Sequence, residues 1–70
     1  MATRKEAIEA VAKHLGIVGA PRLIFADAGD GRWLALGAHN LAVDRDGTVK
    51  APWELFSAQE VDQLRSVFGR

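Results

Sequence analysis

The sequence predicts a single small α+β domain that spans residues 1–70. In chain order it predicts a helix, an antiparallel meander of three or four strands and a second helix (α-β-β-β(-β)-α). Two observations support this prediction. Apolar residues recur at helical spacing near both ends of the chain, and the stretch between them divides into short apolar runs separated by glycine, proline, aspartate and asparagine.

The first predicted helix covers residues 4–15. Thr3 and Glu6 have the spacing of a capping box, in which each side chain accepts a hydrogen bond from the backbone of the other residue. Gly16 stands where a left-handed residue ends a helix. Apolar residues between these signals recur at helical spacing: Ala7, Ile8, Val11, Ala12 and Leu15.

The second predicted helix begins after Ser57, which forms another capping box with Glu60. Phe56 and Val61 are spaced as a hydrophobic staple across this start. Gly69 is expected to end the helix, and its predicted apolar stripe consists of Val61, Leu64, Val67 and Phe68.

The region between the helices predicts short strands bracketed by prolines, which suit the edges of elements and not a central strand. Burial of one sheet face requires a register that gathers the apolar residues. A three-residue loop at 45–47 and a four-residue loop at 28–31 achieve this. The predicted strands cover residues 22–27, 32–36, 41–44 and 48–51. The predicted cross-strand pairs are Phe25 with Leu34, Leu36 with Leu41, and Val43 with Val49.

In this register one face of the sheet is the core, and both helices are expected to pack on it. The core residues are Leu23, Phe25, Leu34, Leu36, Leu41, Val43 and Val49. The other face would then be exposed to solvent, with Trp33 surrounded by small side chains. An exposed patch around an aromatic residue is typical of an interface. The predicted partner-binding residues are Trp33, Ile24, Ala35, Asp44, Lys50 and Trp53. Two alternatives stay open: Trp33 belongs to the core, and Trp53 plugs one end of it.

No motif in the sequence indicates catalysis, a cofactor or a metal. The stretch 44–48 has the composition of a calcium loop, but Ala42 and Trp53 would occupy ligand positions one and twelve, so it predicts a hairpin turn. The glycines of 27–31 lead into a strand and not into a helix, unlike a phosphate-binding loop. His14 and His39 are far apart in the sequence. No nucleophile with a nearby base is evident.

Composition narrows the classes of partner. Nine basic residues balance nine acidic ones, which argues against a general polyanion binder. No apolar run approaches the roughly 20 residues that cross a membrane. No signal peptide is evident, and cysteine is absent, so a cytoplasmic protein is expected.

The sequence therefore predicts a small non-enzymatic protein–protein interaction module: an adaptor, an accessory subunit or an inhibitor of a larger assembly. An inhibitor encoded by a phage or mobile element is one concrete version. The expected partner is another protein or a second copy in a homodimer. The alternative is a nucleic-acid-binding accessory protein, in which Trp33 stacks on a base beside a basic residue such as Lys50.

Overall fold

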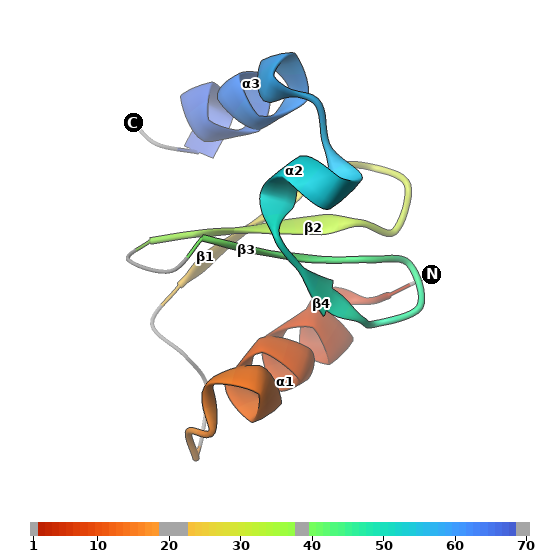
Figure 1. The fold of residues 1–70 in the computed structure, drawn as a ribbon, viewed down its shortest axis with the longest axis vertical. Coiled ribbons are helices and arrows are strands. Elements are labelled where there is room, and N and C mark those ends of the chain that lie inside the picture. The colour runs from red at the N-terminus through yellow and green to blue at the C-terminus, as the bar shows by residue number, and fades with distance from the viewer. Residues whose placement is uncertain (1, 19–22, 38–39, 69–70) are drawn as a thin grey trace.

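A computed structural model of the chain describes residues 2–18, 23–37 and 40–68. Four strands form one antiparallel sheet in the order β1-β2-β3-β4, so each strand pairs with its neighbour in the sequence (Figure 1). The predicted α+β class and meander are confirmed. The elements are α1 (Arg4–Leu15), β1 (Ile24–Asp27), β2 (Trp33–Leu36), β3 (Leu41–Val43), β4 (Val49–Lys50), α2 (Pro52–Leu55) and α3 (Ala58–Phe68).

Helix α1 has the predicted bounds and both predicted caps. The Thr3 hydroxyl accepts a hydrogen bond from the Glu6 amide at 3.2 Å, and the Glu6 carboxylate accepts one from the Thr3 amide at 3.1 Å. At the other end Gly16 is left-handed with φ 70°, and the Ile17 amide donates to the Ala12 carbonyl at 3.1 Å. The helix is therefore defined by local hydrogen bonds at both ends.

Helix α3 begins with the predicted capping box. The Glu60 amide donates to the Ser57 hydroxyl at 3.2 Å, and the Ser57 amide donates to the Glu60 carboxylate at 3.0 Å. Phe56 and Val61 belong to one apolar cluster, as a hydrophobic staple requires. Some predicted element boundaries lie outside the described residues: Pro21 and Arg22 at the start of the first strand, and Gly69 at the end of the second helix. His39 also lies outside them. Helix α2, a single turn, was not predicted and replaces what looked like a connector.

The β3–β4 hairpin has the predicted register, with Val43 opposite Val49. Its loop is a hairpin turn in which Gly47 has φ 86° and donates its amide to the Asp44 carbonyl at 2.9 Å. The Asp46 carboxylate accepts a hydrogen bond from the Thr48 amide at 2.9 Å. These aspartates therefore stabilise the turn itself.

The other two predicted pairings are wrong by one residue. Phe25 lies opposite Ala35, not Leu34, and Ala35 rather than Leu36 lies opposite Leu41. Each of the two connections holds one residue more than predicted: five residues, 36–40, separate Ala35 from Leu41, and five residues, 28–32, form the β1–β2 loop. Two left-handed glycines, at φ 90° and 94°, widen this loop. Left-handed backbone of this kind is accessible to glycine at little cost.

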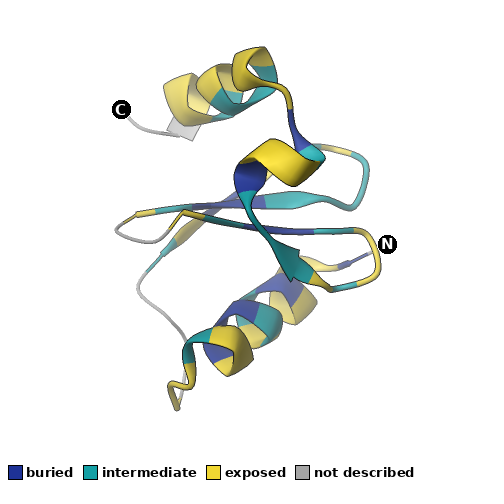
Figure 2. Ribbon diagram, viewed as in Figure 1, coloured by how far each residue is buried: buried dark blue, intermediate teal, exposed yellow. Residues whose placement is uncertain are grey.

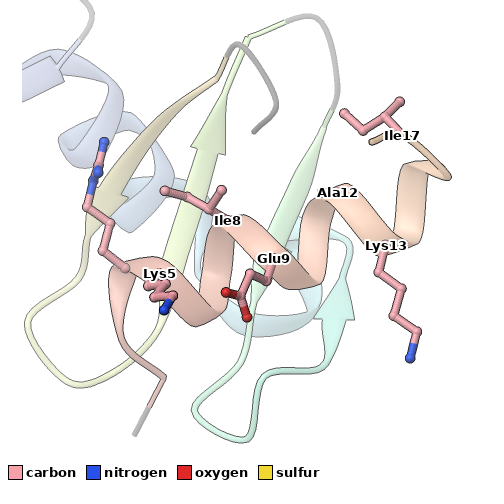
Figure 3. Close-up of a pocket in the computed structure, with 7 residues that line it drawn as sticks. Lys5, Ile8, Glu9, Ala12, Lys13 and Ile17 are labelled. Carbon is pink, nitrogen blue, oxygen red and sulfur yellow. The ribbon is translucent and has the colours of Figure 1, made fainter. Parts of the chain in front are cut away.

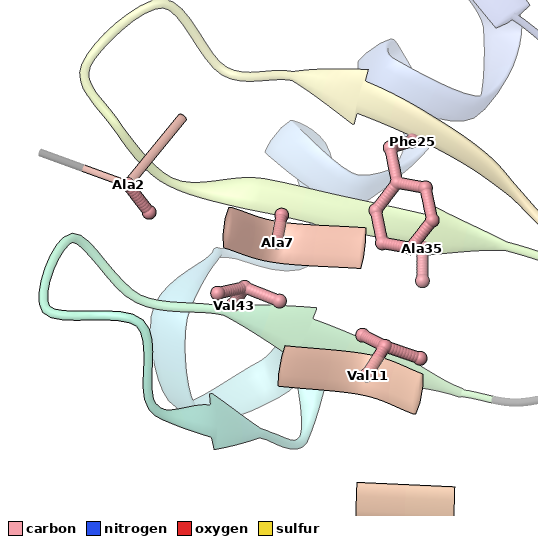
Figure 4. Close-up of a cluster of buried hydrophobic side chains, with 6 residues drawn as sticks. All are labelled: Ala2, Ala7, Val11, Phe25, Ala35 and Val43. Atoms are coloured by element: carbon pink, nitrogen blue, oxygen red, sulfur yellow. The ribbon is translucent and has the colours of Figure 1, made fainter. Parts of the chain in front are cut away.

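This slip exchanges the two faces of β2, because successive side chains of a strand point to opposite sides. Two buried clusters result, one on each face of the sheet (Figure 2). The cluster under α1 contains Ala2, Ala7, Val11, Phe25, Ala35 and Val43 (Figure 4). The cluster under α2 and α3 contains Ala26, Leu34, Ala42 and Phe56.

The prediction that both helices pack on one face of the sheet is therefore wrong. Helix α1 covers one face, and α2 and α3 cover the other, so the sheet is the middle layer of three (Figure 1). The open sheet face on which an interface was predicted does not exist in the described structure.

Trp33 lies on the α1 side of the sheet, half-buried against the cluster of apolar side chains there. Its indole N–H donates a hydrogen bond to the Ala2 carbonyl at 2.8 Å. The prediction that Trp33 is displayed on an open face is wrong, and the alternative, a core position, is confirmed. The ring joins the segment before α1 to the sheet.

A cluster of charged residues joins the β1–β2 loop to the layer of α2 and α3. The Arg32 guanidinium lies 4.6 Å from the centre of the Phe56 ring and donates to the Leu55 carbonyl. It also binds the Asp30 carboxylate at 2.8–3.0 Å and approaches that of Glu60 at 3.5 Å. The hydrogen bond from the Arg32 side chain holds the pKa of Asp30 well below its usual range.

Replacing Trp33 by alanine is expected to lower the free energy of unfolding by about 3 kcal/mol, because a large ring and its hydrogen bond to Ala2 are lost. Trp33→Phe keeps most of the buried area and is expected to cost about 1 kcal/mol. Urea denaturation followed by circular dichroism measures both values. Equal stability of Trp33→Ala and the unchanged protein would contradict a core position.

The free energy of unfolding is expected to fall as the pH drops below about 4, the ordinary pKa of an unfolded aspartate. The pKa of Asp30 is lower in the folded protein, so its stabilisation is present above the unfolded pKa and is lost toward lower pH. Asp30→Asn should lower stability at neutral pH and flatten this acid limb. Asp62→Asn, at an exposed position of α3, is the control and should leave the limb unchanged.

Candidate functional site

The residues predicted to bind a partner do not form one patch. Trp33 is half-buried against the cluster under α1, and Ala35 is only 4% exposed beneath α1, so neither is displayed on an open face of the sheet. Ile24, at the start of the edge strand β1, is 54% exposed. Asp44 and Lys50 are half-buried and pair with each other. Of the two tryptophans, the one at the surface is Trp53, with 72% of its area exposed.

Helix α2 holds Trp53 at the surface. Pro52 is buried at the first position of this turn, where a proline needs no hydrogen-bond acceptor for its nitrogen. The Glu54 carboxylate accepts a hydrogen bond from the Ala51 amide at 2.9 Å, and the Phe56 amide donates to the Pro52 carbonyl at 2.9 Å. The prediction that Trp53 plugs one end of the core is wrong, because the neighbouring Pro52 and Phe56 occupy the buried positions.

Two paired polar residues, Asp44 just after β3 and Lys50 on β4, lie on the side of the sheet that α2 covers. The ammonium group of Lys50 lies 3.2 Å from the Asp44 carboxylate. The pKa of Asp44 is lowered, first by a hydrogen bond from the Arg45 amide and then by Lys50. Lys50 lies opposite Ala42, a member of the cluster beneath α2. An ion pair thus lies in the strand segment that leads into the turn carrying Trp53.

A second surface feature, which the sequence analysis missed, is a groove along α1 (Figure 3). Ile8, Ala12 and Ile17 form its apolar side. A charged row, Lys5, Glu9 and Lys13, runs along the other side of the helix in Figure 3, and Arg4 also lines the groove. Residues spaced by four lie on one helix face, so this row is visible in the sequence. Ile8 and Ala12 were assigned there to the core stripe, and in the structure Ala12 is buried and Ile8 packs against the cluster under α1.

Among residues 2–18, 23–37 and 40–68, no group of three or more histidine, aspartate or glutamate side chains is gathered for a metal ion. No helix in these segments is long and apolar enough to cross a membrane.

No protein family matches this chain, and neither a curated protein nor a solved structure matches it significantly. The functional argument therefore rests on the surfaces of the molecule itself: the exposed Trp53 on α2 and the groove along α1.

Trp53 is expected to contribute almost nothing to folding, because its side chain is mostly in water. Trp53→Ser should change the free energy of unfolding by no more than about 0.5 kcal/mol, in contrast to the larger loss for Trp33→Ala. In a Trp33→Phe background the fluorescence comes from Trp53 alone, and acrylamide should quench it almost as efficiently as it quenches free tryptophan. Strong protection from acrylamide would contradict the exposed position.

Proposed function

We propose that this protein is a non-enzymatic protein–protein interaction module that binds its partner through Trp53. The observation that supports this proposal is the 72% exposure of a tryptophan on a helical turn whose flanking residues are fixed. Tryptophan is the residue type most enriched among those that dominate binding energy at interfaces. Its indole offers a large contact area with little loss of side-chain entropy.

The position of Trp53 matches what a central contact residue requires. The buried Pro52 and Phe56 hold the backbone on both sides, so little order has to be gained when the indole meets a pocket. The pair Lys50 and Asp44 lies in the strands just before the turn and supplies polar groups for the rim of an interface. These features support a preformed contact surface with an aromatic centre.

The proposed class of function is the one that the sequence predicts, but the proposed contact surface is a different one. The predicted open sheet face, with Trp33 and Ala35, is replaced by α2 on the opposite layer. With Trp33 in the core, the alternative in which this ring stacks on a nucleic-acid base loses its stacking residue. Adaptor, accessory subunit and inhibitor all fit a module that acts through one exposed aromatic residue.

Affinity capture with the tagged full-length chain, from nuclease-treated lysate of its source cell, tests this proposal. Trp53→Ser should weaken binding of a stoichiometric partner protein roughly thirtyfold, as expected for a residue worth about 2 kcal/mol. The matched control is Val67→Ser, which alters a side chain on α3 that is 70% exposed, and it should bind like the unchanged protein.

Sedimentation of the purified chain identifies a partner that is a second copy. In that case the protein dimerises, and Trp53→Ser sediments as a monomer while Val67→Ser does not. The proposal fails if Trp53→Ser retains every partner of the unchanged protein and leaves its sedimentation unaltered, or if Val67→Ser has the same effect as Trp53→Ser.

A further inference from the structure

Helix α1, whose residues line the groove, covers the opposite face of the sheet from α2 (Figure 1), so the groove is separate from the Trp53 surface. Its described lining residues all belong to α1 or to the residues just beyond it. Sites for small molecules surround most of their ligand, and a groove lined from one helix does not. An elongated partner lying along the helix fits this shape better.

The charges along the groove are one-sided. Arg4, Lys5 and Lys13 supply three positive charges, and Glu9 supplies a single negative one. No described residue lies within ion-pair distance of these three basic side chains. The chain as a whole has no net charge, so this excess is local. The unpaired charges favour a partner that carries carboxylates.

The direction of the helix adds to this argument. Arg4 and Lys5 lie in the first turn of α1, where the helix dipole is positive and a basic residue is unfavourable. Acidic groups of a partner placed beside this turn would remove that repulsion. Basic residues at this end thus weaken the isolated helix and gain from an acidic partner.

A second copy of the chain does not satisfy these charges. Two copies of α1 packed about a two-fold axis run either antiparallel, with the Lys5 end of one against the Lys13 end of the other, or parallel, with each lysine against the same lysine of the other copy. Glu9, midway between these lysines, would then face Glu9 of the other copy. Like charges in both places disfavour self-association through this groove.

We propose that the groove along α1 binds an acidic amphipathic helix of another protein. Apolar side chains of that helix lie on the exposed Ile17 and the half-buried Ile8, beside the buried Ala12, and its carboxylates meet the basic groups near both ends of the groove. Helix-in-groove recognition needs apolar contacts at spacings of three and four residues. Since α1 has 12 residues, or about 18 Å, a partner helix of roughly 12 residues matches it. This inference does not depend on the proposed role of Trp53.

A designed peptide pair tests this proposal on the full chain. The acidic probe is a capped amphipathic helix of roughly 12 residues with leucines on one face and glutamates beside them. The control probe has lysine in place of every glutamate. In ¹⁵N–¹H spectra the acidic probe should shift the amides of residues 4–17 and leave those of α3 in place. The control probe should bind at least tenfold more weakly.

A charge reversal on the protein completes the test. Lys5→Glu with Lys13→Glu should weaken binding of the acidic probe at least tenfold and should create binding of the lysine probe. Both positions are exposed, and circular dichroism verifies folding. Trp53→Ser should bind the acidic probe like the unchanged protein, which separates this proposal from the preceding one.

Three results would overturn the proposal. One is the absence of saturable shifts in α1 with the acidic probe. Another is equal binding of the two probes. In the third, an oligonucleotide duplex or vesicles of anionic lipid shift the amides of α1, and the acidic peptide does not. The double charge reversal then removes those shifts. That result would assign the basic row to a nucleic acid or a membrane surface.

Discussion

The contact between Arg32 and Asp30 connects the backbone of the first hairpin to the packing of the C-terminal helices. Asp30 lies between two left-handed glycines, and the same carboxylate binds Arg32 and Arg45. Exposed ion pairs contribute at most about 1 kcal/mol, so the importance of this one lies in geometry. It fixes the wide loop, the loop sets the register of β1 and β2, and the register assigns each strand residue to a layer. The rest of the Arg32 guanidinium then contacts Phe56 and Leu55 and holds the second layer in place.

Local signals in the sequence predict much of this fold, and non-local ones do not. Both capping boxes and the β3–β4 turn were predicted correctly, because each depends on residues within four positions of one another. The registers of β2 with β1 and with β3 were wrong, because they accompany packing on both faces of the sheet, which joins residues that are distant in sequence. A usable signal was present: strands covered on both faces read as continuous apolar runs. The strand sequences IFAD, WLAL and LAV are such runs, but the sequence analysis assumed that buried and exposed residues alternate along each strand.

The two parts of the candidate site, Trp53 and the groove along α1, also differ in how far the sequence predicts them. Trp53 was named from the sequence, but its exposure follows from the helical turn at Pro52, which the sequence analysis treated as a connector. The groove along α1 escaped notice because Ile8 and Ala12 were counted as core residues, although they also line the outside of the helix. If both proposals hold, the protein has one contact surface on each outer layer, with the sheet between them. Such an arrangement suits a small protein that brings two others together.

The position of α1 has a consequence for the order of folding. Every strand pairs with its neighbour in the chain, so the sheet forms from local hairpins and needs no long loop closure. Helix α1 is the exception, because it packs on β3 and β4 as well as on β1. During synthesis this helix leaves the ribosome before the strands, and its apolar side stays uncovered until β3 and β4 have emerged. For that interval Val11 and its neighbours are open to chaperones, and the cluster under α1 is complete only when the final hairpin closes.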